Sequence, residues 1–261
     1  MRSKAANYPK VFDYTPDRSR DGPRRFLEVE DDAGRRRRWR GYLQCDAYKG
    51  YEGLFAAERQ RRRQIYEVGC WAHARRYFYD ARASSGQDAI EALALIGRLY
   101  HVKHEAREAK VEGRALLAHR REHAEPVLKS FKVWMLARLG ARTGVLPQSE
   151  LGKAIHYTYD NFRALSRYIM RGYLNIDNNA AERALRNVVI GRKNWLFAGS
   201  DEGGKSAAVI YSLVESAKHC GCNPYEYLRD VLTRLPETRM SAVGELLPDA
   251  RLKARRASTA S

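Results

Sequence analysis

The stretch Leu174–Ser200, LNIDNNAAERALRNVVIGRKNWLFAGS, predicts a short helix that carries one carboxylate among cations. Three residues of types favoured at helix N-caps precede helix-favouring alanines and leucine. Those cap candidates are Asp177, Asn178 and Asn179. Glu182 falls in the first turns, and Arg186 lies four residues on, on the same helical face. The stretch fits either a surface helix with an ion pair worth about 0.3–0.5 kcal/mol or a carboxylate placed for chemistry.

The end of this stretch is basic and then aromatic. Gly191 is expected to end the helix, because glycine is the residue most often found just after a helix. The cations of the stretch are candidate phosphate contacts, with pairing to Glu182 or helix capping as the structural alternative. They are Arg183, Arg186, Arg192 and Lys193. Trp195 and Phe197 are expected in the core rather than stacked on bases.

The charge of the whole chain points to a polyanionic partner. Among 261 residues, 48 Lys and Arg stand against 31 Asp and Glu, for a net charge of +17. An excess of this size favours a nucleic acid over a merely solvated basic surface, and leaves DNA and RNA both open.

Cysteine usage and hydropathy predict a cytoplasmic protein. The four cysteines, at 45, 70, 220 and 222, make no paired metal-binding pattern, so unpaired thiols are expected. No apolar run reaches the roughly 18–20 residues of a membrane span, and MRSKAANYPK is not followed by the apolar segment of a secretory signal.

A second informative stretch is GYLQCDAYKG, residues 41–50. Its apolar start predicts a buried strand that ends at Asp46. Open α/β sheets place ligand-binding groups at the carboxyl ends of strands, although an Asp that caps the next helix is an ordinary alternative. Residues 65–70 predict another strand, and residues 71–83 a helix on which His73 is expected to be structural.

The remaining elements follow from periodicity and turn signals. Helices are predicted at 51–63, along most of 88–139 as a hairpin, and at 151–169, 207–219 and 223–235. YPKVFDY, residues 8–14, predicts a short strand, and the charged stretch EDDAGRRRRWR an exposed loop. DEGGKS, residues 201–206, lacks the spacing of a phosphate loop, so it does not predict a nucleotide site. It predicts a turn that leads into the helix at 207–219.

Asp46 and Glu182 together suit divalent metal chemistry. A strand end that presents an Asp and a helix that presents a Glu can hold Mg²⁺, which prefers hard oxygen ligands. Two such ions can activate an attacking hydroxyl and stabilise the leaving oxygen in phosphodiester chemistry.

Four segments of the chain resemble the insertion-sequence-66 family of bacterial DDE transposases, across about residues 8–248. They are YLQCDAYKGYEGL, GCWAHARRYFYDA, LNIDNNAAERALRNVVIGRKNWLFAGSDEGG and YSLVESAKHCGCNPYEYLRDVL. The resemblance implies an RNase H-like catalytic core and DNA strand cleavage and joining with two Mg²⁺ (or Mn²⁺) ions. Asp46 would be the second and Glu182 the third acidic residue of the triad.

The family's first catalytic Asp matches no position here, and Asp13 is a poor substitute for it. The chain is therefore expected to be an N-terminally truncated transposase, inactive alone, with unpaired sheet edges. Its expected partners are DNA, as element ends and target, and other transposase subunits at the nucleoid, with no membrane.

The expected fold is α/β (α+β) and helix-rich overall, with an incomplete RNase H-like core. The expected regions are a partial core at 1–85, a helical insertion at 86–172, the catalytic Glu helix segment at 173–205, a C-terminal helical region at 206–248 and a disordered basic tail at 249–261. Two other functions stay open: a non-catalytic DNA-binding regulator of transposition, and a basic helical RNA-binding protein.

Overall fold

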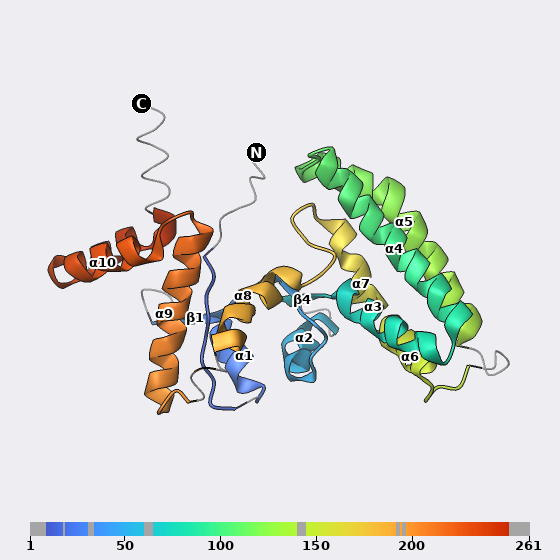
Figure 1. Cartoon of the computed structure of the whole chain (residues 1–261), viewed down its shortest axis with the longest axis horizontal. Helices are drawn as coiled ribbons and strands as arrows, with labels where there is room; N and C mark the ends of the chain where they lie inside the picture. Colours follow the sequence, from blue (N-terminus) through green and yellow to red (C-terminus); the bar gives the residue numbers. More distant parts are fainter. Residues whose placement is uncertain are drawn as a thin grey trace. The chain divides into compact units, whose positions relative to one another are not determined.

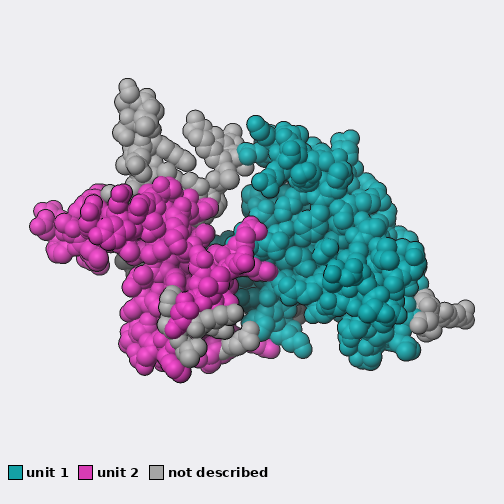
Figure 2. Space-filling model, viewed as in Figure 1, with its two compact units in different colours: residues 1–3, 23–180 teal, residues 4–22, 181–261 magenta. Residues whose placement is uncertain are grey.

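A computed structural model describes residues 9–17, 19–30, 34–59, 65–139, 145–191, 194 and 197–250. These residues form two compact units (Figures 1 and 2). The first unit contains residues 23–180, and the second contains residues 9–22 together with 181–250. No helix in the described ranges is long and apolar enough to cross a membrane.

The first unit contains two parallel strands with a helix between them in the chain. Strand β3 (Gly41–Gln44) pairs with β4 (Ile65–Val68), and η1 (Lys49–Tyr51) and α2 (Glu52–Arg59) lie between them in the chain. Cys45, Phe55 and Ile65 form a small buried cluster, because apolar residues of the strands meet the apolar side of α2. Both strand predictions are confirmed, as is the helix as far as Arg59. The helix-rich α/β class is confirmed with them.

After β4, the first unit is mainly helical. The helices are α3 (Trp71–Asp80), η2 (Ala81–Ala83), α4 (Gly86–Glu108), α5 (Gly113–Arg138), α6 (Glu150–Asp160), α7 (Phe162–Ser166) and η3 (Arg167–Met170). Figure 1 shows α4 and α5 side by side as the predicted hairpin. Phe131 of α5 lies at the centre of the main core, with its ring against Trp71, Phe78 and Trp134. The single helix predicted at 151–169 is wrong, because the chain turns at Asn161 and continues as α7 and η3.

The exposed loop predicted for the charged stretch before β3 is a second wrong prediction. The stretch forms a hairpin of β1 (Glu28–Glu30) and β2 (Arg36–Arg38) rather than an exposed loop alone. The register places Glu28 opposite Arg38, and the Arg38 Nε lies 3.6 Å from a Glu28 carboxylate oxygen. Opposite charges on facing strands stabilise an antiparallel pair, and the sequence pattern alone did not reveal that pairing. Before β1 lies the short helix α1 (Asp21–Phe26).

The second unit is built on α9 (Asp201–His219). Its other elements are α8 (Asn179–Gly191), whose first two residues belong to the first unit, α10 (Pro224–Arg234), η4 (Leu235–Glu237) and η5 (Met240–Leu246). A small core joins α9, α10 and η5 through Ala217, Tyr227, Val231 and Leu246. Gly191 is the last residue of α8 before two residues outside the described ranges, and Asn223 caps α10 by accepting from two backbone amides.

Residues 9–15 are extended but form no strand, so that prediction is wrong. They lie along α9 instead. The Ser216 hydroxyl bonds both the amide and the carbonyl of Lys10, and the Ser212 hydroxyl does the same for Phe12. Two extended residues advance about 6.6 Å and four helical residues about 6 Å, so alternate residues of the segment meet successive turns of α9.

Two further predictions fail in the second unit. DEGGKS is the first part of α9 rather than a turn before it, with the Ser200 side chain as its N-cap. Gly204 lies under the ring of Tyr14, where a Cβ would come within 2.5 Å of ring atoms, so the glycine serves a close approach rather than a break. Phe197, expected in the core, is 85% exposed. Trp195 lies outside the described residues.

Candidate active site at the carboxyl end of the parallel strands

Asp46 lies two residues beyond the last residue of β3, and its side chain is exposed. The backbone hydrogen bonds between the two strands continue one residue beyond β3, where the Cys45 amide donates to the Val68 carbonyl at 3.1 Å. A carboxylate oxygen of Asp46 accepts from the Tyr48 amide at 3.3 Å. This bond spans Ala47, which has a φ of 60°, a conformation that costs a non-glycine residue about 1–2 kcal/mol. Local backbone geometry thus fixes Asp46 at the strand end, where the sequence predicted it.

Tyr157 brings α6 to the same strand end. Its hydroxyl donates to the Asp46 carbonyl at 3.4 Å, and its ring stacks on Tyr77 with centroids 4.5 Å apart. Burial raises the pKa of Tyr157, and the nearby Tyr77 and Cys70 raise it further, so the phenol stays protonated at neutral pH. Both rings line a cavity of about 590 Å³, together with Lys153 and His156. No local sequence pattern points to Tyr157, which lies 111 positions from Asp46.

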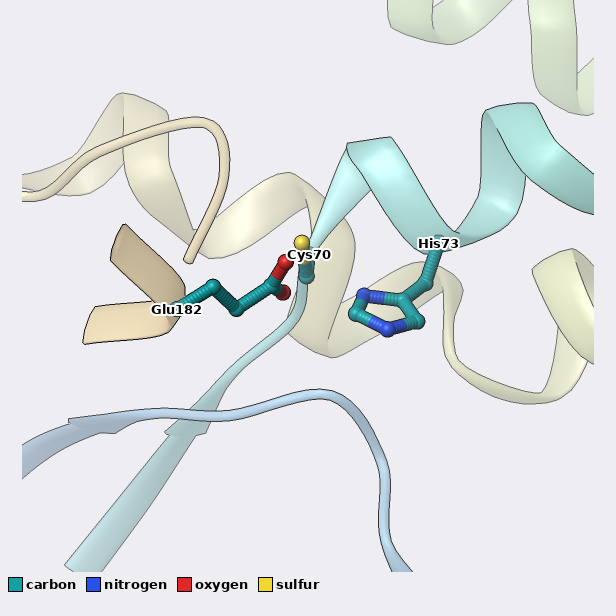
Figure 3. A group of neighbouring side chains, drawn as sticks. All are labelled: Cys70, His73 and Glu182. Atoms are coloured by element: carbon teal, nitrogen blue, oxygen red, sulfur yellow. The ribbon is translucent and has the colours of Figure 1, made fainter. Parts of the chain in front are cut away.

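Cys70 and His73 lie where β4 leads into α3 (Figure 3). Cys70 is buried, and its Sγ accepts from the Asn178 amide at 3.2 Å. The neighbouring Cys45 is also buried, and burial raises the pKa of its thiol to about 12. A protonated, buried thiol is a poor nucleophile, so Cys45 is structural. No disulfide joins Cys45, Cys70, Cys220 and Cys222, as predicted.

The segment that leads into α8 is anchored to the first unit. The Ile176 carbonyl accepts from the Trp71 amide at 3.1 Å. Asp177 is buried, accepts from the Asn179 amide at 3.2 Å and pairs with the Lys103 ammonium at 2.8 Å. Asp177 therefore serves both as a cap of α8 and as an attachment to α4. The sequence identified the cap and missed the ion pair.

The remaining predicted site residues lie on or after α8. Glu182 is in its first turn, in the second unit, and its side chain is exposed. Arg183 and Arg186 are exposed on the same helix. Arg192 and Lys193 lie outside the described residues. Exposed cations next to an exposed carboxylate are compatible with contacts to a polyanion.

Comparison with known proteins identifies two matching family models. The model described as Transposase IS66 family matches residues 2–206, and the IS66 C-terminal element matches residues 212–248. Two similar proteins are from Sinorhizobium fredii. Uncharacterized protein y4jD is 32% identical over 80% of this chain and 40% of its own length. Uncharacterized protein y4qI is 35% identical over 76% of this chain and 36% of its own length. The chain thus spans about two fifths of the length of these relatives. No solved structure gives a significant match.

Proposed function

Because the chain belongs to the Transposase IS66 family, we propose that it forms part of an insertion-sequence transposase that cleaves and joins DNA with divalent metal ions. The observation that supports this most is the position of Asp46. It is an exposed carboxylate, held by the Tyr48 amide, directly beyond the carboxyl end of a strand in a parallel pair. This is where open α/β sheets bind ligands.

The residues present suit Mg²⁺ or Mn²⁺. Asp46 offers hard carboxylate oxygens, whereas the buried thiols of Cys45 and Cys70 would suit softer metals. We assign Asp46 and Glu182 as metal ligands, in an RNase H-like core that this chain supplies in part. Bound metal would polarise the phosphate and lower the pKa of the attacking hydroxyl.

The chain's own groups orient the substrate in this proposal. The Tyr48 amide holds the Asp46 carboxylate, and the Tyr157 hydroxyl donates to the Asp46 backbone carbonyl. The carboxylate can therefore bind metal with little rearrangement. Arg183, Arg186, Arg192 and Lys193 would contact phosphates. A third acidic residue would come from a segment or subunit outside this chain, so this chain alone should bind metal without cleaving DNA.

Terbium luminescence tests the Asp46 assignment. Tyr48 lies beside Asp46, and burial followed by the Asp46 charge raises the pKa of Tyr51, so Tb³⁺ bound at Asp46 should be sensitised by tyrosine excitation. We expect Asp46→Asn to weaken Tb³⁺ binding at least tenfold, since it removes the charged ligand, and Mg²⁺ to compete in the unchanged chain. The control Asp80→Asn removes an exposed carboxylate at the end of α3.

Equal Tb³⁺ binding by the unchanged chain and Asp46→Asn would reject the assignment. A supercoiled plasmid incubated with the chain and Mn²⁺ tests the second part of the proposal. Nicking that Asp46→Asn abolishes would show that no third carboxylate from outside is required. A DNA affinity that changes neither with metal nor in Asp46→Asn would favour a non-catalytic DNA-binding regulator.

A further inference from the structure

A second cavity, of about 810 Å³, lies entirely within the first unit. Residues of β3, β4, α5, α6, α7 and η3 line it. None of the metal ligands and phosphate contacts assigned above lines it. Its volume is within the range of sites that hold small organic ligands, about 300–1,000 Å³.

Aromatic rings provide the apolar part of this cavity. Tyr42 and Tyr66 are register partners on the parallel strands, with ring centroids 5.3 Å apart and planes 31° apart. Tyr159 and Phe162 also line the cavity. Tyr42, Tyr66 and Phe162 are half-buried and Tyr159 is 38% exposed, so ring surface remains accessible. Planar rings arranged in this way are stacking platforms for nucleobases.

Cations provide the charge. Lys132, Arg163 and Arg167 line the cavity against one carboxylate, Asp160. Arg167 donates to the Glu67 carbonyl and lies over the Tyr66 ring at 5.6 Å, which holds its guanidinium beside the aromatic wall. Lys132 is exposed and has no ion-pair partner within the described ranges. A ligand that combines a flat ring with a negative charge complements this lining.

Ser166 adds a polar group. Ser166 lines the same cavity, and its Oγ is buried and has no hydrogen-bond partner among the residues that the structure describes. A buried hydroxyl without a partner is destabilising, and a ligand with donors or acceptors on its ring would satisfy it.

We propose that this cavity binds an unpaired nucleotide of single-stranded DNA, with the base stacked on the tyrosines, its edge at Ser166 and its phosphate at Lys132 and Arg163. A base within a duplex is covered by its neighbours and cannot enter, so the ligand must be an unpaired or extruded nucleotide. The choice of DNA rests on the proposed function, but the site requires no metal.

The test uses the full chain in EDTA and an oligodeoxynucleotide carrying 2-aminopurine, the emission of which is quenched by stacking. We expect quenching with the single strand, and at least tenfold weaker binding of the same sequence as a duplex. Tyr159→Leu should weaken single-strand binding about tenfold, while Tyr159→Phe keeps the ring and the affinity. Circular dichroism checks that both variants fold.

A second variant tests the phosphate contact. Lys132→Gln should lower the slope of log affinity against log salt by about 0.7. Lys129→Gln, on the same helix but outside the cavity, should leave the slope unchanged. The proposal is overturned by equal binding of single strand and duplex, by unchanged quenching in Tyr159→Leu, or by equal slopes for the two lysine variants. Because EDTA is present throughout, failure here is distinct from failure to bind Tb³⁺ at Asp46.

Discussion

The two units are stabilised in different ways. In the first unit, a continuous apolar core runs from β4 through α3, α4, α5 and α6. In the second unit, the core cluster contains four buried residues, and polar side chains on α9 bind backbone and charged groups around them. Apolar periodicity therefore describes the first unit, while the second depends on hydrogen bonds that periodicity does not detect.

Removing a central ring should have the largest effect. Phe131→Ala should destabilise the first unit by about 3–5 kcal/mol, because the buried ring contacts Trp71, Phe78 and Trp134 and leaves a cavity among them. Urea unfolding followed by tryptophan fluorescence measures the loss. Val133→Ala, at a side chain 67% exposed on the same helix, is the control. A loss below 1 kcal/mol for Phe131→Ala would mean that this core is not the main support of the unit.

The second unit should respond to the loss of one buried charge. Glu215 accepts from Asn187 and Lys218 at 2.9 and 2.8 Å and lies 3.5 Å from the Lys10 ammonium. Burial opposes ionisation, but these partners outweigh it and lower the pKa of Glu215. Glu215→Gln should therefore destabilise the second unit by about 1.5–3 kcal/mol at neutral pH, measured by urea unfolding followed by circular dichroism.

The pH dependence sharpens this prediction. Because the pKa of Glu215 is lowered in the folded state, its contribution is present above the ordinary glutamate pKa of 4.5 and is lost as the pH falls through the lower folded value. The difference between the unchanged chain and Glu215→Gln should shrink in that acidic range. A difference that stays constant down to pH 3 would show that shape rather than charge is responsible.

The smallest effect is expected from the serines on α9. Ser212→Ala and Ser216→Ala should each destabilise the second unit by about 0.5–1.5 kcal/mol, because each hydroxyl bonds both an amide and a carbonyl of the extended segment. Hydrogen exchange of the Lys10 and Phe12 amides should accelerate. Ser206→Ala, exposed on the same helix, is the matched control. Unchanged exchange in the double variant would mean that other contacts hold the segment.

Sequence predictions were correct where apolar residues determine an element and wrong where long-range polar contacts determine it. The α4–α5 hairpin was predicted because apolar residues recur with the period of a helix, and strands β3 and β4 were predicted from short, largely apolar stretches. The strand at 8–14 was predicted from its aromatic and β-branched residues, but the groups that bind the described part are serine hydroxyls about 200 positions away. The start of α9 was missed because DEGGKS predicts a turn, whereas these residues are helical and Gly204 accommodates Tyr14.

The candidate site was partly predictable for a similar reason. Asp46 follows a recognisable strand, so its place at the strand end could be predicted locally. The Tyr157–Asp46 hydrogen bond and the Lys103–Asp177 ion pair each join a helix to a residue 74 or more positions away, which local patterns do not contain. Glu182 was placed on its helix, and its role as a metal ligand with Asp46 stays a prediction.

Iron-directed cleavage of the chain tests that central claim most directly. Fe²⁺ that occupies the metal site in place of Mg²⁺ generates radicals that cut the nearest backbone in the presence of ascorbate and peroxide, and mass spectrometry locates the cuts. We predict cuts within a few residues of both Asp46 and Glu182, suppressed by Mg²⁺ and lost from both places in Asp46→Asn. Cuts at only one of the two residues, or cuts that persist in Asp46→Asn, would contradict a metal site shared by Asp46 and Glu182.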